Sequence, residues 1–335
     1  VLEFFSGIGG MRASLYGALA DGAAAQAGPA GRDALDFAAF DSSNVVNDVY
    51  SHNVRTGALH GTGESSPNRL NIEGLRESDL DGRAEIWTMS PPCQPFTTTK
   101  DALRKDMGDM RNKAFINLMD VLQRLKSPPK WIFMENVKGF VDSETHHRWT
   151  KVLVACGYGF RQFLLNPIQF RIPNNRMRFY MACCLGAGPE DGFESDQAVV
   201  VNTVSACDCP SVRTLQVHGK SLDVTFNDSI DAPLNKLHEL GEDGVSGPPG
   251  TNPLSEFVLA DAELGEELGS LMIPDEKLQK KWAMGLSYIG REDCCTFCFT
   301  SSYGNTMHKS SGSLFHVERP RGKLLNKEED MSREN

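Results

Sequence analysis

The stretch that decides the fold runs from Ala84 to Thr97 and reads AEIWTMSPPCQPFT. Its first six residues form an apolar run, which indicates a buried strand. The loop after this run holds Cys93 among three prolines, and proline both fixes the backbone angle φ and removes a hydrogen-bond donor. The loop is therefore stiff and keeps the thiol in one direction. Because ligands bind at the carboxyl ends of strands in open α/β sheets, we interpret Cys93 as a nucleophile; the alternative is a buried structural cysteine.

Strand-like and helix-like segments alternate through the first half of the chain. The apolar, strand-like runs are 1–5, 34–40, 84–89, 130–134, 160–165 and 179–184. The helix-like segments between them are 11–20, 43–52, 112–125 and 145–156. Such alternation predicts an α/β fold with a Rossmann-like, mostly parallel sheet that carries helices on both faces.

The alternation decays after about Gly186. We therefore predict a first domain over residues 1–186 and a smaller, irregular second domain over residues 187–318. The last segment, 319–335, is charged, and we expect it to be disordered.

Composition limits the classes of protein to which this chain can belong. Its 335 residues are 40% apolar, enough for a sizeable core. No run approaches the roughly 18 apolar residues of a membrane span, so we expect no membrane partner. The nine cysteines have no regular spacing, which favours a reducing compartment, the cytoplasm or the nucleus.

Charge and the first residues add two weaker expectations. The net charge of −10 argues against a nucleic-acid partner, but many of the acidic residues cluster between 239 and 267, which weakens that argument. The chain opens without Met and with strand-like residues, so we expect a trimmed chain without a signal peptide. We assume a monomer.

A glycine-rich turn, SGIGG over residues 6–10, follows the first strand-like run. Glycine lets a backbone approach a ligand and exposes the N-terminus of the next helix. A dinucleotide site would have a third glycine where this chain has Arg12, so NAD is disfavoured. Asp41 ends the second strand-like run, where a carboxylate can accept both hydroxyls of a ribose. Together these features favour an adenosine-type ligand; the alternatives are a tight structural turn and a helix N-cap.

Charged side chains stand near the ends of two later strand-like runs. Glu135 follows the run 130–134 and could act as a general acid or read the edge of a base; a capping or ion-paired carboxylate is the alternative. Arg176 and Arg178 precede the run 179–184 and would share one face of a strand. Paired guanidinium groups can hold a carbonyl oxygen or a phosphate, or they can form a solvated pair at an edge.

The cysteine spacing does not favour a metal site. Cys295 and Cys298 have a spacing that zinc sites use, but Cys207 and Cys209 are too close for a typical tetrahedral site. We therefore expect no metal.

Four motifs, taken in order, resemble those of the cytosine-5 methyltransferases. They are Phe5-Ser6-Gly7-Ile8-Gly9-Gly10, Pro91-Pro92-Cys93-Gln94, Glu135-Asn136-Val137 and Arg176-Met177-Arg178. The longer forms, Ser90 through Thr97 and Glu135 through Phe140, are similar to the eukaryotic branch that modifies tRNA. The segment Cys298-Phe299-Thr300 resembles a hallmark of that branch in its target-recognition region.

The resemblance implies S-adenosylmethionine as the methyl donor and a cytosine in the anticodon loop of tRNA-Asp as the acceptor. It also implies that residues 1–186 bind the cofactor and carry out catalysis, and that residues 187–318 recognise the target. The cofactor-binding residues that it implies are Ile8, Gly9 and Gly10 at the methionine end, Asp41 at the ribose, Ser42, Ile72 and Glu73 at the adenine, and Ser90 in the pocket lining. The implied substrate-recognition residues are Gln94, Cys298, Phe299 and Thr300.

The same resemblance assigns the chemistry to four residues. Cys93 would add to C6 of cytosine as a thiolate, and Glu135 would donate a proton to N3. Arg178 would bind the base oxygen O2, with Arg176 as support.

Two other functions stay open. A DNA cytosine-5 methyltransferase would use the same chemistry, although Cys298-Phe299-Thr300 favours tRNA. Members of the family also continue into two further motifs that the residues after His316 do not contain. An inactive fragment that binds RNA or cofactor is therefore the second alternative.

Overall fold

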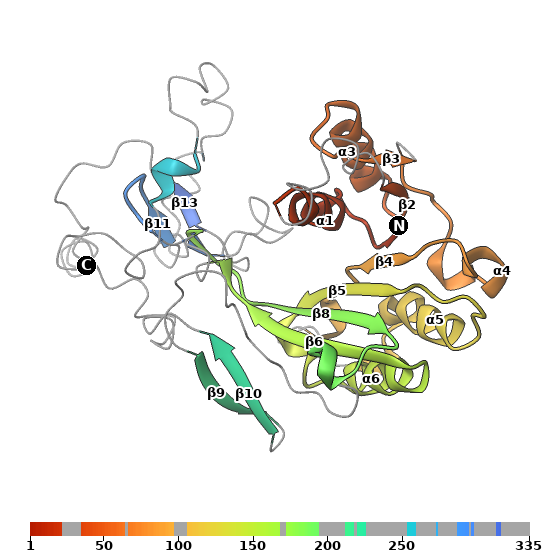
Figure 1. The fold of residues 1–335 in the computed structure, drawn as a ribbon. Helices are drawn as coiled ribbons and strands as arrows, with labels where there is room; N and C mark the ends of the chain where they lie inside the picture. The colour runs from red at the N-terminus through yellow and green to blue at the C-terminus, as the bar shows by residue number, and fades with distance from the viewer. Residues whose placement is uncertain are drawn as a thin grey trace. The chain divides into compact units, whose positions relative to one another are not determined.

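A seven-stranded sheet is the largest element of the fold (Figure 1). The computed structural model describes residues 1–21, 35–63, 66–96, 106–167, 172–193, 212–217, 220–225, 253–258, 273, 287–294, 296–297 and 313–315. In spatial order the strands of the sheet are β3 (Thr62–Gly63), β2 (Asp36–Phe40), β1 (Leu2–Phe4), β4 (Ile86–Met89), β5 (Trp131–Val137), β8 (Arg178–Leu185) and β6 (Tyr158–Leu165).

Helices cover both faces of this sheet. The described α-helices are α1 (Gly10–Asp21), α3 (Asn44–Arg55), α4 (Glu77–Leu80), α5 (Lys113–Leu122) and α6 (Glu144–Ala155). Figure 1 shows α1 and α3 on one side of the sheet and α5 and α6 on the other. The chain proceeds from β1 through β2 to β3 in one direction and from β4 to β5 in the other, and right-handed crossovers in opposite directions put their helices on opposite faces. The predicted Rossmann-like, mostly parallel α/β fold is confirmed.

Strand β8 is the exception to the parallel arrangement. It pairs antiparallel with β5 on one side and with β6 on the other, whereas β1, β2, β3, β4 and β5 pair in parallel. A parallel pair needs a long crossover, usually a helix. Between β6 and β8 the described residues contain only the short strand β7 (Asn174–Asn175) and no crossover helix, so the chain returns in the opposite direction.

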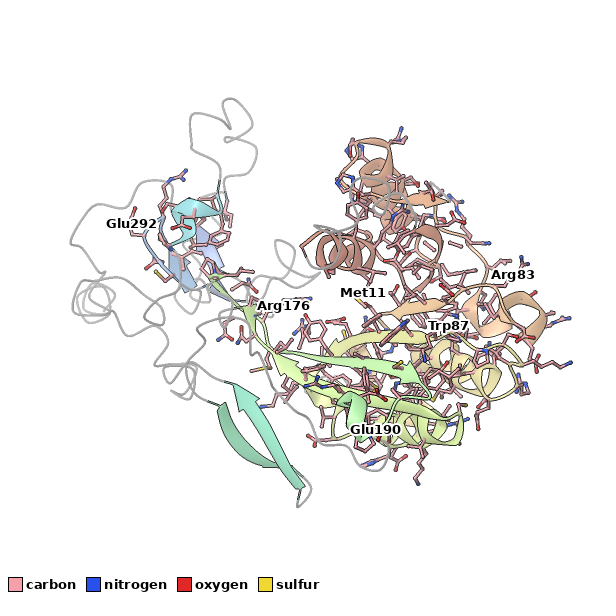
Figure 2. All side chains as sticks on the ribbon, in the orientation of Figure 1. Met11, Arg83, Trp87, Arg176, Glu190 and Glu292 are labelled. Atoms are coloured by element: carbon pink, nitrogen blue, oxygen red, sulfur yellow. The ribbon has the colours of Figure 1, made fainter. Side chains whose placement is uncertain are left out.

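The hydrophobic core lies against the middle strands. Trp87 of β4 is fully buried (Figure 2) and meets Phe4 edge to face, with ring centroids 5.1 Å apart. Phe4 stacks in turn on Phe40 at 5.3 Å. Helix α5 buries a set of apolar side chains at the spacing of one helical face. That set is Phe115, Leu118, Met119 and Leu122.

A buried polar cluster of Glu3, Arg12 and Tyr50 joins β1, α1 and α3, and all three side chains are fully buried. The Tyr50 hydroxyl donates to Glu3 Oε2 at 2.9 Å, and the Arg12 backbone N–H donates to Glu3 Oε1 at 3.1 Å. The Arg12 guanidinium donates from Nη1 to Tyr50 Oη at 3.2 Å. Burial raises the pKa of Glu3 to about 7, although the Tyr50 and Arg12 hydrogen bonds and the Arg12 charge act in the opposite direction. Burial also raises the pKa of Tyr50.

The chain forms two compact units. The first comprises Val1–Leu165, Met177–Thr203 and Val212–Val224, and the second comprises Asn166–Arg176, Val204–Ser211 and Thr225–Asn335. Beyond the large sheet, β7 pairs with β12 (Thr296–Phe297), β11 (Ser287–Ile289) pairs with β13 (Ser313–Phe315), and β9 (Val212–Val217) pairs with β10 (Lys220–Thr225). The predicted domains 1–186 and 187–318 and the predicted tail 319–335 stay predictions. None of the helices in the described part of the chain is long and apolar enough to cross a membrane.

The buried carboxyl group of Glu3 makes the unfolding free energy depend on pH. Its pKa in the folded chain is about 7, above its ordinary value of 4.5, so the folded state binds the proton more tightly than the unfolded state does. The stability from this protonated group is complete below pH 4.5 and is lost as the pH rises through about 7. At about 1.4 kcal/mol per pKa unit, the total loss is up to roughly 3 kcal/mol.

We therefore expect the unfolding free energy of Glu3→Gln to fall much less between pH 4.5 and 7 than that of the wild-type chain. Urea unfolding of the wild-type chain and the variant at several pH values measures this difference. A wild-type chain whose stability falls no more steeply than that of Glu3→Gln over this interval would contradict the assignment.

Candidate active site

The carboxyl ends of β1, β2, β4 and β5 lie at one edge of the sheet, because these strands are parallel. The strand order reverses between β1 and β4, and a crevice at such a reversal is where open α/β sheets bind ligands. The glycine turn at residues 6–10 follows β1, and the loop of Cys93 follows β4. The Ser90 N–H donates to the Phe4 carbonyl at 3.3 Å, so the two segments begin side by side.

The glycine turn has a conformation that ordinary side chains disfavour. Gly7 and Gly9 have φ angles of +53° and +95°, in the region that glycine occupies without strain. The Gly9 N–H donates to the Ser6 carbonyl at 3.0 Å, and α1 begins at Gly10. A Cβ built on Gly7 or Gly10 would meet only open space, and the Ile8 side chain beside them is 54% exposed. The turn therefore leaves room for a ligand above its backbone.

Asp41 connects this turn to the start of α3. Its Oδ2 accepts the Gly7 N–H at 3.0 Å, and its Oδ1 accepts the Ser43 N–H at 2.9 Å. These bonds tie the turn to the segment before α3, whose N-cap is Ser43 and not Asp41. Since each carboxylate oxygen can accept two hydrogen bonds, Asp41 keeps capacity for the hydroxyls of a ribose. The neighbouring Ser42 is exposed.

The predicted adenine segment is a short helical turn, η2 (Ile72–Gly74). Ile72 is buried and Glu73 is exposed, and the Glu73 N–H donates to Asn71 Oδ1 at 3.1 Å. The Asn117 side chain of α5 donates to the carbonyls of Ile72 at 2.8 Å and of Leu75 at 3.0 Å. An open glycine turn, a carboxylate with spare acceptor capacity and a fixed apolar segment fit an adenosine-containing ligand.

The Cys93 loop packs on the segment that follows β5. Cys93 is partly buried, and its carbonyl accepts the Phe96 N–H at 2.9 Å within the short helix η3 (Gln94–Phe96). The Phe96 ring meets Phe140 edge to face at 5.1 Å. A Cβ built on Gly139 would lie only 2.3 Å from the Phe96 carbonyl oxygen. Only glycine at position 139 therefore allows this approach of the two segments.

The Glu135 carboxylate and the Arg178 guanidinium form an ion pair beside this loop. Arg178 Nε lies 3.3 Å from Glu135 Oε1, and the two side chains are 17% and 24% exposed. The antiparallel register pairs Val137 with Arg178 and Glu135 with Tyr180, which puts both charges on the same face of the sheet. The Asn136 side chain donates to the Pro91 carbonyl at 3.4 Å, so the strand of Glu135 is tied to the loop of Cys93.

A second ion pair, Asp109–Arg111, follows the Cys93 loop in the sequence. Arg111 donates from Nε to Asp109 Oδ1 at 2.8 Å and from Nη2 to Asp109 Oδ2 at 2.5 Å. The Asp109 hydrogen bond raises the pKa of Arg111, and the negative charges of Asp109 and Cys93 act in the same direction. The Asp109 carboxylate therefore balances the charge of this guanidinium.

One predicted arrangement is wrong, and three predicted residues lie outside the described part of the chain. Arg176 does not share a strand face with Arg178, because β8 begins only at Arg178. Arg176 belongs to the second unit, where its backbone N–H donates to Asn166 Oδ1 at 3.1 Å, and its supporting role stays a prediction. Cys298, Phe299 and Thr300 lie outside the described residues.

Gln94 and Ser90 follow β4, as expected for that loop; Gln94 is exposed and Ser90 is partly buried. No role was predicted for Gly139 or Asn117. A glycine two residues after the strand of Glu135 is a sequence signal for a close backbone contact, whereas an amide on a polar position of α5 gives no comparable signal. In the described part of the chain, no group of three or more His, Cys, Asp or Glu side chains could hold a metal ion.

Comparisons with known proteins agree with this geometry. Residues 1–204 match the model of C-5 cytosine-specific DNA methylases. The chain is 30% identical over 332 residues to the tRNA (cytosine(38)-C(5))-methyltransferase of Rattus norvegicus, and this alignment covers 95% of the chain and 78% of that protein. It is 36% identical over 201 residues to the DNA (cytosine-5)-methyltransferase of Dictyostelium discoideum, covering 59% of the chain and 46% of that protein.

A solved structure shares the fold. The crystal structure of the S. pombe Dnmt2 methyltransferase has a TM-score of 0.60 at 22% identity, over 96% of this chain and 76% of that one. Fold and sequence thus agree on the class of protein, an enzyme family that methylates cytosine at C5. The chain belongs to the C-5 cytosine-specific DNA methylase family.

The contact of Gly139 with Phe96 predicts a sensitive position outside the reacting residues. In Gly139→Ala the new methyl group would overlap the Phe96 carbonyl and move the Cys93 loop away from β5. Because a displacement of about 1 Å can cost about 100-fold in rate, we expect kcat for methyl transfer to fall by about that factor. Steady-state kinetics measure the effect.

Gly188→Ala is the matched control, because a Cβ there meets no atom within 4 Å. It should leave kcat unchanged. Wild-type kcat in Gly139→Ala would show that this contact does not position the thiol.

Proposed function

We propose that this chain transfers a methyl group from S-adenosylmethionine to C5 of a cytosine in tRNA, the anticodon loop of tRNA-Asp being the first substrate to test. The observation that carries the proposal is the meeting of the Cys93 loop, the Glu135–Arg178 pair and the glycine turn at one edge of the sheet. The rat relative, which aligns with nearly the whole chain, is named a tRNA (cytosine(38)-C(5))-methyltransferase, and this name supports the choice of substrate.

The residues around the glycine turn fit the cofactor. Asp41 would accept hydrogen bonds from the ribose hydroxyls, Ile72 would contact the adenine, and the backbone of Gly9 and Gly10 would border the methionine end. Ser90, beside the end of β1, would line the same cofactor site. When bound there, S-adenosylmethionine supplies an electrophilic methyl group on its sulfonium.

Residues after β4, near the end of β5 and at the start of β8 would activate the base. The Cys93 thiolate adds to C6 of cytosine, and the electrons of the C5–C6 double bond make C5 nucleophilic. Glu135 supplies a hydrogen bond or a proton at N3, and Arg178 holds the oxygen O2. Both groups therefore stabilise the electron density that addition at C6 moves toward N3 and O2. After C5 takes the methyl group, loss of the C5 proton restores the double bond and expels the thiolate.

A DNA cytosine is the second candidate substrate. The family description and the Dictyostelium discoideum relative both name DNA, and the chemistry is the same. A base must leave its stack before Cys93 can reach C6, and this costs less in a single-stranded loop than in a duplex. An RNA loop is therefore the better-supported substrate.

Methyl transfer from labelled S-adenosylmethionine tests the function directly. We expect label on tRNA and none on duplex DNA, and a loss of about 1,000-fold or more in Cys93→Ala, because the variant lacks the sulfur that would bond to C6. Cys156→Ala, at the end of α6, is the matched control and should keep the activity. Label on DNA alone would favour the second candidate, and full activity in Cys93→Ala would refute the mechanism.

A further inference from the structure

Arg12 is a fully buried arginine directly after the glycine turn. Its Nε donates to the His60 carbonyl at 2.8 Å, and its Nη2 donates to the Gly61 carbonyl at 2.9 Å. The guanidinium also lies over the Phe37 ring, 4.5 Å from its centroid. One side chain near the start of α1 thus binds two consecutive carbonyls of a segment 48 and 49 residues away in sequence.

The segment that Arg12 binds packs against the glycine turn. Leu59 immediately precedes the two bonded carbonyls, and a Cβ built on Gly9 would lie 2.2 Å from Leu59 Cδ1. Gly9 is therefore pressed against Leu59. On the same side, the Asn53 side chain of α3 donates to the Ile8 carbonyl at 3.0 Å, and the Leu59 N–H donates to the Asn53 carbonyl at 3.0 Å. The position of the turn backbone thus depends on where Leu59 and its neighbours lie.

Glu3 and Tyr50 also hold Arg12 in place through hydrogen bonds. Glu3 accepts the Arg12 backbone N–H, and Tyr50 bridges the Glu3 carboxylate and the Arg12 guanidinium. Because β1 carries Glu3, the cluster sets the orientation of Arg12 relative to the strand that leads into the glycine turn.

Stability alone gives a weak reason for an arginine at this position. A buried charge has a large desolvation penalty that its hydrogen bonds only offset, and apolar side chains of similar volume are often as stable or more stable in such places. The guanidinium fork differs from an apolar side chain in one respect, since it can bind two carbonyls in a fixed geometry.

We propose that Arg12 is a positioning residue for S-adenosylmethionine: its two hydrogen bonds to the 60–61 carbonyls hold Leu59 against Gly9 and keep the glycine turn in its cofactor-binding conformation. This inference rests on the proposed function, because it takes the turn as the cofactor site. Arg12 itself does not contact the cofactor or the reacting atoms. It stands where a dinucleotide fingerprint has its third glycine, and its side chain holds the segment that packs against the turn.

The test separates cofactor affinity from stability. Isothermal titration calorimetry gives the Kd for S-adenosylhomocysteine, well below the melting temperature of each variant, and calorimetric scans give Tm. We expect a Kd increase of about tenfold or more in Arg12→Met. A smaller increase is expected in Arg12→Lys, because an ammonium group cannot reproduce the fork.

Gln162→Leu is the matched control for lost stability. Gln162 is a fully buried residue of β6, at the far edge of the sheet, and its Oε1 lies 2.6 Å from His146 Nε2. This variant should lower Tm and leave Kd within about twofold of the wild-type value.

The outcomes distinguish the inference from the proposed function. A wild-type Kd in Arg12→Met together with a lower Tm would show that Arg12 is only structural, and would overturn the inference alone. A wild-type chain that does not bind S-adenosylhomocysteine would overturn the proposed function, and the inference with it. If Arg12→Met does not fold, the Kd values of Arg12→Lys and Tyr50→Phe replace its own. Both should exceed the Kd of Gln162→Leu, and values no higher than that would overturn the inference.

Discussion

The pairing of β1 with β2 on one side and β4 on the other is the constraint on which the rest of the structure depends. Leu2 is opposite Ala38 in β2 and opposite Trp87 in β4, so three parallel strands end together. The chain leaves β1 toward one half of the sheet and returns at β4 to build the other half. The glycine turn and the Cys93 loop therefore lie at the same edge of the sheet, although about eighty residues separate them in the sequence.

Contacts with the backbone hold together the segments that carry Cys93 and Glu135. The Ser90 N–H reaches the end of β1, the Asn136 amide reaches the Pro91 carbonyl, and the Phe96 carbonyl rests on Gly139. These contacts fix the loop of Cys93 relative to the strand that carries Glu135. Proline-rich loops suit this arrangement, because their carbonyls are good acceptors while they donate few hydrogen bonds of their own.

The sequence was sufficient to predict the elements with strong periodicity and the order of the motifs. The apolar run before Cys93 became β4, and the helix expected over 112–125 became α5 with one apolar face inward. The positions of the glycine turn, Asp41 and Cys93 after strands followed from the same alternation, because parallel strands bring their carboxyl ends to one edge. Glu135 was expected after its strand, but it lies within β5, which extends to Val137.

What could not be predicted depends on contacts between distant segments. The antiparallel direction of β8 comes from the short return after β6, and strand patterns carry no direction. Arg176 falls outside β8, since a strand boundary depends on pairing with β5. From the sequence alone, Arg12 served only as evidence against a dinucleotide fingerprint. Arginine is rarely buried without partners, and the partners of Arg12, Tyr50 and the 60–61 carbonyls, lie far along the chain.

The central claim is that the Cys93 sulfur bonds to C6 of a cytosine during methyl transfer. An anticodon stem-loop RNA containing 5-fluorocytidine, incubated with the chain and S-adenosylmethionine, tests it most directly. Fluorine at C5 cannot leave as a proton does, so the thiolate cannot be expelled and the adduct accumulates. Mass spectrometry of the digested complex should find the RNA mass on the peptide that contains Cys93. An adduct on a different cysteine, or methylation of ordinary tRNA with no adduct on the fluorinated RNA, would contradict the account.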